Sequence, residues 1–346
     1  MFSRFSYSSF SIVRRTSLPL ALCALTLTVG CSAGAPAAQP RSSAGSDSDA
    51  AQTTQDAKSP AAASRVVKHL GGETTITGTP QRIAVLDYRL ADSLSALGLK
   101  PYAMNTYLGD TQLPYMDADA LAGVQPLGDE TNLEAVLAAK PDLIIAREPD
   151  LEKYDQLTAI APTLVVGNPA QNWKSDLLAF GDMLERRPQA EEWIANYEAK
   201  AADVRADIDK VVPEGSTFLY LRVLPKEIRV HAPDKALAEV LNGELKLAAA
   251  KGVEKIDNIE AISLEVLPDF DADYIFMQVG FPEAEGDDDA KQNLSRIQQS
   301  SIWQNLKAVK AGHVYEVPHW AISDYPNIKD RSLDLVREAL TGADRE

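Results

Sequence analysis

The stretch PQAEEWIANYEAKAADVRADIDKV, residues 188–211, decides the fold that we predict for this chain. Its apolar positions recur at intervals of three and four residues, the period of one helix face, at Trp193, Tyr197, Ala201, Val204, Ile208 and Val211. Pro188 suits the first turn of a helix. A helix of these 24 residues is about 36 Å long, far longer than a normal crossover. We therefore predict a stiff spine between two lobes, with a long surface helix on one large domain as the alternative.

Short β-rich segments alternate with helical patterns on both sides of this spine. The expected strands are residues 82–88 (RIAVLDY), 142–146, 163–167, 217–223, 227–231, 273–279 and 313–317. This alternation predicts parallel sheets with crossover helices. The predicted fold class is therefore α/β, with two Rossmann-like lobes at 66–187 and 212–346 and the bridging helix at 188–211.

One pattern occurs once in each half of the chain. Leu133-Glu134 precedes a strand that follows Asp142, and Leu264-Glu265 precedes a strand that follows Asp273, with eight residues from glutamate to aspartate in both. Both segments predict a helix that carries the glutamate, then a loop and a buried strand. The repeat favours equivalent places for Glu134 and Glu265 on two related lobes. A chance likeness between two helix–strand units is the alternative.

Composition excludes several classes of protein. The 346 residues are 45% apolar and 24% charged, with 34 basic and 50 acidic side chains and a formal charge of −16. Nucleic-acid binding needs clustered Lys and Arg, which this acidic chain does not display. The two cysteines and four scattered histidines favour neither a zinc site nor a disulfide framework. Because dinucleotide, P-loop and HExxH motifs are also absent, we predict neither an enzyme nor a resident cofactor or metal.

The first 65 residues predict export and anchoring. Residues 1–30 carry three arginines and no acid before a short apolar run, as a secretory signal does, and their removal would change the formal charge to −19. Residues 27–31 (LTVGC) resemble the lipobox of bacterial lipoproteins, in which the cysteine, here Cys31, is acylated; an ordinary signal is the alternative. Residues 32–65 lack Val, Ile, Leu, Met and aromatic residues. We therefore predict a flexible tether at 31–65, of about 30 Å root-mean-square reach.

Four motifs, taken in order, resemble the substrate-binding lipoproteins of iron–siderophore ABC importers. They are GTPQRIAVLD (78–87), ALGLKP (96–101), NLEA with KPDLII (132–135 and 140–145), and AVKAGHVY (308–315). The resemblance covers residues 66–341 and is strongest with the ferric hydroxamate receptors. It implies two α/β lobes joined by a rigid helix, with a ligand cleft between the lobes. It also implies a monomer without catalysis, and a place on the outer side of the membrane, in the periplasm or at the cell surface.

The resemblance also implies roles for particular residues. Glu134 and Glu265 stand where such receptors dock onto arginines of the ABC permease, which works with its ATPase; helix-surface glutamates without a role are the alternative. The ligand would meet arginines and aromatic rings near the carboxyl ends of strands. The residues expected there are Arg89, Arg147, Arg222, Trp320, Tyr325, Trp173 and Tyr107. Surface salt bridges, for the arginines, and core packing, for Trp320, are the alternatives.

The ligand expected from this resemblance is a ferric siderophore of hydroxamate or citrate–hydroxamate type. Six oxygens already surround its iron, so the receptor needs no metal ligands of its own. A net charge of −19 disfavours a strongly anionic tris-catecholate complex through long-range repulsion. Where some hydroxamate receptors carry an arginine before NLE, this chain has Gly128-Asp129-Glu130-Thr131, so its ligand clamp must be arranged differently. A cobalamin or heme receptor and a secreted α/β hydrolase are the competing hypotheses.

Overall fold

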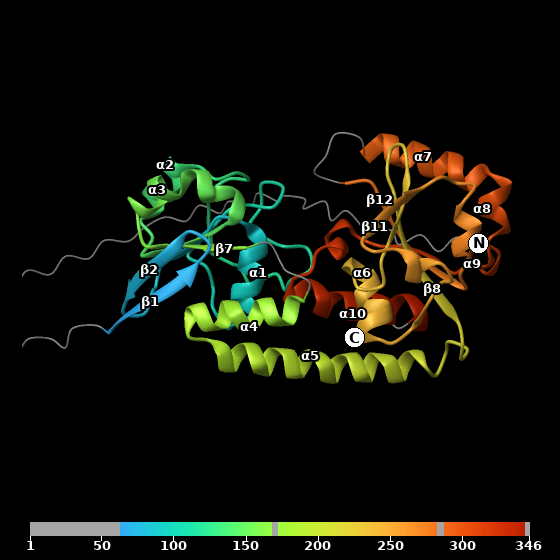
Figure 1. The fold of residues 1–346 in the computed structure, drawn as a ribbon, viewed down its shortest axis with the longest axis horizontal. Helices are drawn as coiled ribbons and strands as arrows, with labels where there is room; N and C mark the ends of the chain where they lie inside the picture. Colours follow the sequence, from blue (N-terminus) through green and yellow to red (C-terminus); the bar gives the residue numbers. More distant parts are fainter. Residues whose placement is uncertain (1–62, 168–171, 282–286, 343–346) are drawn as a thin grey trace, which may run out of the picture. The chain divides into compact units, whose positions relative to one another are not determined.

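In the computed structural model, which describes residues 63–167, 172–281 and 287–342, the chain forms two α/β lobes and a long connecting helix (Figure 1). The predicted signal peptide, Cys31 and residues 31–62 of the predicted tether lie outside the described residues. An antiparallel hairpin opens the described chain, and its first strand begins at Ser64, inside the predicted tether: β1 (Ser64–His69) and β2 (Gly72–Thr77). Within the described ranges, no helix has the length and apolar character needed to cross a bilayer.

The N-terminal lobe is built on a parallel sheet of five strands in the order β5-β4-β3-β6-β7. Its strands are β3 (Ile83–Val85), β4 (Ala103–Met104), β5 (Gln125–Pro126), β6 (Leu143–Arg147) and β7 (Thr163–Val166). Its helices are α1 (Tyr88–Ala96), α2 (Leu133–Ala139), the 3₁₀ helix η1 (Glu148–Lys153), α3 (Tyr154–Thr158) and α4 (Trp173–Leu184). Every residue of β3 and β6 is buried, as expected for a parallel sheet covered on both faces.

The C-terminal lobe is built on a mixed sheet in the order β11-β9-β8-β12-β13, with β10 beside β8. Its strands are β8 (Thr217–Val223), β9 (Ile228–His231), β10 (Ala248–Ala249), β11 (Ile259–Ile262), β12 (Tyr274–Val279) and β13 (Val314–Glu316). The prediction of purely parallel pairing is wrong here, because β9 runs antiparallel to both β8 and β11. Only four residues connect β8 to β9, and a connection that short joins antiparallel strands.

Short helices surround this second sheet. They are α6 (Ala236–Ala238), the π-helix η2 (Glu239–Glu244), η3 (Val253–Lys255), η4 (Leu267–Phe270), α7 (Asp287–Gln299), α8 (Ser301–Asn305), α9 (Lys307–Ala311) and η5 (His319–Ile322). The helix predicted at Glu265 is absent: this residue lies in a turn before η4. A helix that began at Leu264 would need an N–H at position 268, and Pro268 has none.

The aspartates of the repeated pattern make the same contact in both lobes. The Asp142 carboxylate accepts hydrogen bonds from the backbone N–H groups of Gln81 and Arg82, both at 2.8 Å, just before β3. The Asp273 carboxylate accepts from the N–H and hydroxyl of Thr217, at 2.9 and 2.8 Å, at the start of β8. Each aspartate therefore ties its own strand to the parallel neighbour in the same register, as two related lobes require.

The bridging helix α5 (Arg187–Ile208) makes contacts to both lobes. At its beginning, Ala190 packs against Gly181 of α4. Near its end, Arg205 Nη1 donates to the carbonyls of Leu245 and Lys246 in the C-terminal lobe, at 2.7 and 2.8 Å. Of the predicted apolar face, Tyr197, Ala201, Val204 and Ile208 are buried, Trp193 is half-buried, and Val211 is 52% exposed. The helix ends at Ile208, three residues earlier than predicted, and Pro213 disfavours its continuation through Val212.

The C-terminal helix α10 (Pro326–Thr341) is a second connection between the lobes. Its Asn327 donates from its N–H and side-chain amide to Asp92 Oδ1 on α1, both at 3.0 Å. Its Lys329 binds Glu239 and, at 2.6 Å, Asp324, both in the C-terminal part of the chain. The helix therefore belongs to both lobes rather than to the predicted 212–346 lobe alone.

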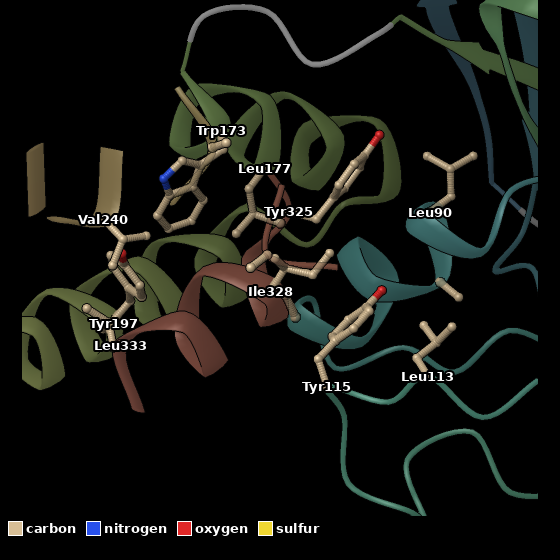
Figure 2. Close-up of a cluster of buried hydrophobic side chains, with 14 of the residues drawn as sticks. Leu90, Leu113, Tyr115, Trp173, Leu177, Tyr197, Val240, Tyr325, Ile328 and Leu333 are labelled. Atoms are coloured by element: carbon tan, nitrogen blue, oxygen red, sulfur yellow. The ribbon is translucent and has the colours of Figure 1, made fainter. Parts of the chain in front are cut away.

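A single hydrophobic cluster runs between α1, α4, α5, α10 and η2 (Figure 2). Figure 2 shows Trp173 and Leu177 of α4 facing Tyr197 of α5 and Ile328 of α10. Separate clusters fill the second face of each sheet. Because the largest cluster is shared between the lobes, burial of apolar surface holds the connecting helices against both of them.

We expect Asp92→Asn to stabilise the protein at neutral pH but not in acid. Burial raises the pKa of Asp92 to about 7, although Asn327 hydrogen bonds favour its charged form. The native state therefore holds a proton that the unfolded chain loses near pH 4, so this carboxyl lowers stability as pH rises towards 7. The gain in the free energy of unfolding should increase between about pH 4 and 7 to at most about 4 kcal/mol and then stay constant.

Urea unfolding of both proteins between pH 4 and 8 measures this difference. Asp117→Asn, at an exposed carboxylate, is the control and should give a flat difference. A flat difference for Asp92→Asn as well would contradict the account of this contact.

Candidate functional site

In the N-terminal lobe, two predicted ligand-binding arginines lie together at the carboxyl ends of parallel strands. Arg147 is the last residue of β6, and Arg89 lies in the first turn of α1, which follows β3. Both bind the carboxylate of Asp87: Arg89 Nη2 and Arg147 Nη1 lie 2.7 and 2.8 Å from its Oδ2. Sequence reasoning did not select Asp87, although an acid directly after the buried strand RIAVL is a visible signal.

The Asp87 carboxylate stays charged at this buried position. Burial opposes its ionisation, but hydrogen bonds and charges from Arg89 and then Arg147 outweigh burial and lower the pKa of Asp87. Burial likewise opposes the charge of Arg89, and Asp87 reverses that effect and raises the pKa of Arg89. The three side chains are therefore one fixed ionic group with two positive charges and one negative charge.

Aromatic rings surround this ionic group. The Tyr88 and Tyr107 rings lie 4.8 Å apart, and the Arg89 guanidinium lies 5.1 Å from the Tyr88 ring. Tyr325, just before α10, is buried; burial raises its pKa to about 12, and the charges of Arg147 and Arg89 oppose this rise. The structure thus places Tyr325 near the two arginines, and Tyr107 against Tyr88, which adjoins Arg89. That these rings meet the ligand stays a prediction.

The segment Gly128-Asp129-Glu130-Thr131, which lacks the arginine of some hydroxamate receptors, shapes the loop beside the site. Its Asp129 accepts hydrogen bonds from the Thr106 hydroxyl and, at 2.9 Å, from the Gly109 N–H. These hydrogen bonds lower the pKa of Asp129. The acid at this position therefore holds the turn that carries Tyr107.

In the C-terminal lobe, Arg222 of β8 is buried, with its guanidinium 4.2 Å from the centre of the Phe281 ring. Its Nε and Nη2 atoms have no hydrogen-bond partner among the described residues. Burial, and then the charge of Arg229, lower the pKa of Arg222, while Tyr220 opposes them. Because buried polar atoms are nearly always paired, these two can still take an acceptor beyond the described residues, and a bound ligand is one such acceptor.

A hydrogen-bonded chain connects this arginine's strand to the loop that carries Trp320. The Tyr220 hydroxyl donates to Gln278 Oε1 at 2.8 Å, and Gln278 Nε2 lies 3.3 Å from His319 Nδ1. Trp320 follows in η5, and its ring lies 5.7 Å from that of Tyr115, in the long loop after β4. Trp320 therefore contacts an aromatic ring of the opposite lobe.

The remaining predicted residues lie elsewhere. Trp173 is 3% exposed and packs edge-on against Tyr197 and Trp193, at ring distances of 4.9 and 5.6 Å, so it belongs to the core of the connecting helices. Glu134 and Glu265 are exposed, one on each lobe. Their local settings differ: the Glu134 N–H donates to the N-cap Asn132 of α2, whereas Glu265 lies in a turn, where a side-chain hydrogen bond with Ser263 lowers its pKa.

Four contributors to the site were missed by sequence reasoning besides Asp87. Gln278 has a signal, since it is a polar residue inside the apolar strand YIFMQV. Tyr88 and Phe281 adjoin strand ends, where ligands of open α/β sheets bind. Tyr115 has no signal, because only the path of a loop of some twenty residues (105–124) brings it to Trp320.

No group of three or more His, Cys, Asp and Glu side chains is arranged to hold a metal ion within the described ranges. The buried His231 has no hydrogen-bond partner there, and burial, with the charges of Arg222 and Arg229, lowers its pKa to about 3. Two lobes that present guanidinium and aromatic groups at their strand ends define a two-lobed binding protein rather than an enzyme.

Comparison with known proteins agrees with this class. The family model described as "Periplasmic binding protein" matches residues 83–320, and this chain belongs to that family of substrate-binding proteins. The probable siderophore-binding lipoprotein YfiY of Bacillus subtilis is 34% identical over 267 residues, which are 73% of this chain and 80% of that protein.

Two solved structures show the same fold. Staphylococcus aureus SirA, complexed with staphyloferrin B, is 26% identical, with a TM-score of 0.65 over 80% of this chain and 98% of that one. A Bacillus subtilis periplasmic binding protein of the FhuD fold family, described as part of a ferrichrome ABC transporter, is 28% identical, with a TM-score of 0.70 over 80% of this chain and all of that one.

We expect Trp173→Ala to lower the free energy of unfolding by about 3–5 kcal/mol, because it removes a large buried ring from the core. Trp193→Ala, at the half-buried stacking partner of Tyr197, is the matched control and should cost clearly less. Chemical denaturation measures both. Equal small losses would remove Trp173 from the core.

Proposed function

We propose that this protein is the substrate-binding lipoprotein of an ABC importer, which captures a ferric siderophore of hydroxamate or citrate–hydroxamate type and delivers it to the membrane permease. The observation that carries the proposal is the pair of arginine sites on opposite lobes. Asp87 fixes Arg89 and Arg147 on one side, and on the other side Arg222 keeps two buried polar atoms without a partner among the described residues.

The chemistry of a ferric siderophore suits these groups. Its iron is already surrounded by six oxygens, so the protein needs donors for those oxygens and rings for the organic shell. Guanidinium groups supply the donors, and Tyr88, Tyr107, Tyr115 and Trp320 supply the rings. The printed names of the relatives support the ligand class, since YfiY is called siderophore-binding and the SirA structure holds staphyloferrin B.

The proposed place of the protein is the outer face of the membrane. Cys31 would be the acylated first residue after removal of 1–30, and residues 31–65 would tether the folded body. The name of YfiY as a lipoprotein supports this part of the proposal. The protein would act as a monomer beside the permease and its ATPase.

Titration of the purified body with ferrichrome- or ferrioxamine-type complexes tests the proposal. We expect quenching of tryptophan fluorescence at low ligand concentration, and affinity weaker by about 10–100-fold in both Arg222→Ala and Trp320→Ala, since each loses a direct contact with the complex. Lys310→Ala, in the last turn of α9, is the control and should bind normally.

Binding of cobalamin or heme, with no response to ferric hydroxamates, would show that the protein is a cobalamin or heme receptor instead of a siderophore receptor. Turnover of an ester or phosphoester would replace the binding role with that of a hydrolase. Normal affinity in both site variants would place the ligand elsewhere.

We further propose that Glu134 and Glu265 dock onto arginines of the permease. Both are exposed beside an exposed apolar side chain, Leu137 at 60% and Val266 at 40%. Two carboxylates on two lobes would fix orientation as well as affinity, because arginine–carboxylate pairs can be bidentate.

The double variant Glu134→Ala/Glu265→Ala should abolish siderophore uptake by cells and leave the affinity of the purified protein unchanged. Radiolabelled iron uptake and fluorescence titration measure the two quantities. Glu148→Ala/Glu260→Ala removes two other exposed glutamates, one from each lobe, and should transport normally. Lost affinity in the first variant, or unchanged uptake, would assign these glutamates another role.

A further inference from the structure

The Asp87 carboxylate is fully occupied by the two arginines and the backbone beside it. Its Oδ1 accepts from the Arg89 N–H and from Arg89 Nε, both at 2.8 Å. Its Oδ2 accepts from Arg89 Nη2 at 2.7 Å and from Arg147 Nη1 at 2.8 Å. A carboxylate has about four acceptor positions, and these four bonds use them. Asp87 is therefore placed to hold other groups rather than to contact a ligand itself.

We propose that Asp87 determines the charge of the ferric complex that the site accepts, by holding Arg89 and Arg147 as one unit and cancelling one of their two positive charges. The inference rests on the proposed function and deepens it. Asp87 would be a positioning and specificity-determining residue, whereas Arg89 and Arg147 would touch the ligand.

Because Asp87 and its arginine partners are largely buried, solvent screens the Asp87 charge only weakly and a nearby ligand is affected by it. The side chains of Asp87 and Arg147 are 12% and 11% exposed, and that of Arg89 is 33% exposed, so solvent screens the group only in part. Tyr325, Tyr88 and Tyr107 lie around it as neutral aromatic rings. With Asp87 ionised, the group formed by Asp87, Arg89 and Arg147 carries one net positive charge instead of two.

The effect of Asp87 on binding affinity depends on the charge of the ferric complex. Three hydroxamates leave a ferric ion with a neutral core, whose oxygens need directed donors but gain little from extra positive charge. Three catecholates give a strongly anionic complex, which the Asp87 carboxylate repels and the arginines attract. A fixed arginine pair with one charge cancelled thus favours neutral or weakly charged complexes over strongly anionic ones.

Asp87→Asn tests this inference, because asparagine is of similar size and its amide oxygen can still accept the Arg89 N–H at the start of α1. Fluorescence titration would use ferrichrome as the neutral probe and ferric enterobactin as the tris-catecholate probe. We expect the variant to bind ferrichrome more weakly, and the ratio of enterobactin affinity to ferrichrome affinity to rise by about tenfold or more at low salt. The increase should shrink in high salt.

Two variants separate local charge from other effects. Asp142→Asn makes the same chemical change at the opposite, amino end of β3 and β6, where Asp142 accepts hydrogen bonds from the N–H groups of Gln81 and Arg82. This variant should leave the ratio of the two affinities unchanged. Asp87→Glu keeps the charge and should also keep the ratio, even where the added methylene lowers both affinities.

Each other outcome overturns the inference. An equal loss for both probes in Asp87→Asn would make Asp87 a purely structural residue. Unchanged affinities would place the ligand away from Arg89 and Arg147. Failure of the unaltered protein to bind either complex would instead refute the proposed function, and the inference with it, so the two failures are distinguishable. Should Asp87→Asn not fold, a changed ratio in Asp87→Glu would overturn the inference.

Discussion

The attachment of α10 to both lobes is the constraint on which the rest of the structure depends. Asn327 ties it to α1 of the N-terminal lobe, and Lys329 ties it to Glu239 and Asp324 of the C-terminal part. Lys200 of α5 adds ion pairs to Asp330 and Asp334, at 2.7 and 2.9 Å. Lys329 and Asp334 are almost fully buried, at 1% and 3% exposed, so each requires its partner, because a buried charge left alone would be strongly destabilising. Lys200 and Asp330 are partly exposed, and their pairing contributes less.

This connection explains how two separate sheets can serve one site. The strands of each lobe end in loops that carry arginines and aromatic rings, and the connecting helices limit how far those loops can move apart. The contact of Trp320 with Tyr115 joins the two sets of loops. The same structure leaves Glu134 and Glu265 exposed, as the proposed contact with a permease requires.

The sequence predicted the parts of the fold that depend on local periodicity. The strands in both lobes and the helix across 188–211 are found within a few residues of the predicted ends, because apolar period and chain direction fix them locally. The sequence predicted β9 as a strand but not its antiparallel direction, and it did not predict β11 or α10 as a member of both lobes. Pairing direction and helix docking arise from tertiary contacts that no local pattern contains.

For the site too, the sequence indicated some of the residues and gave no indication of others. Arg89, Arg147 and Arg222 follow from their places at strand ends, and Asp87 and Gln278 have signals that could have been used. Tyr115 could not be found, because it depends on the path of a long loop. Trp173, selected for its position before the bridging helix, lies in the core, where an aromatic residue at a helix start is equally at home.

The central claim is that one ferric complex binds to both lobes at the carboxyl ends of their strands. A crystal structure of the protein with a ferric hydroxamate, in which the anomalous scattering of iron locates the metal, measures this most directly. The account predicts iron with its oxygens in hydrogen-bonding reach of Arg89 or Arg147 on one side and of Arg222 on the other. Iron bound to one lobe alone, or at the opposite ends of the strands, would contradict it.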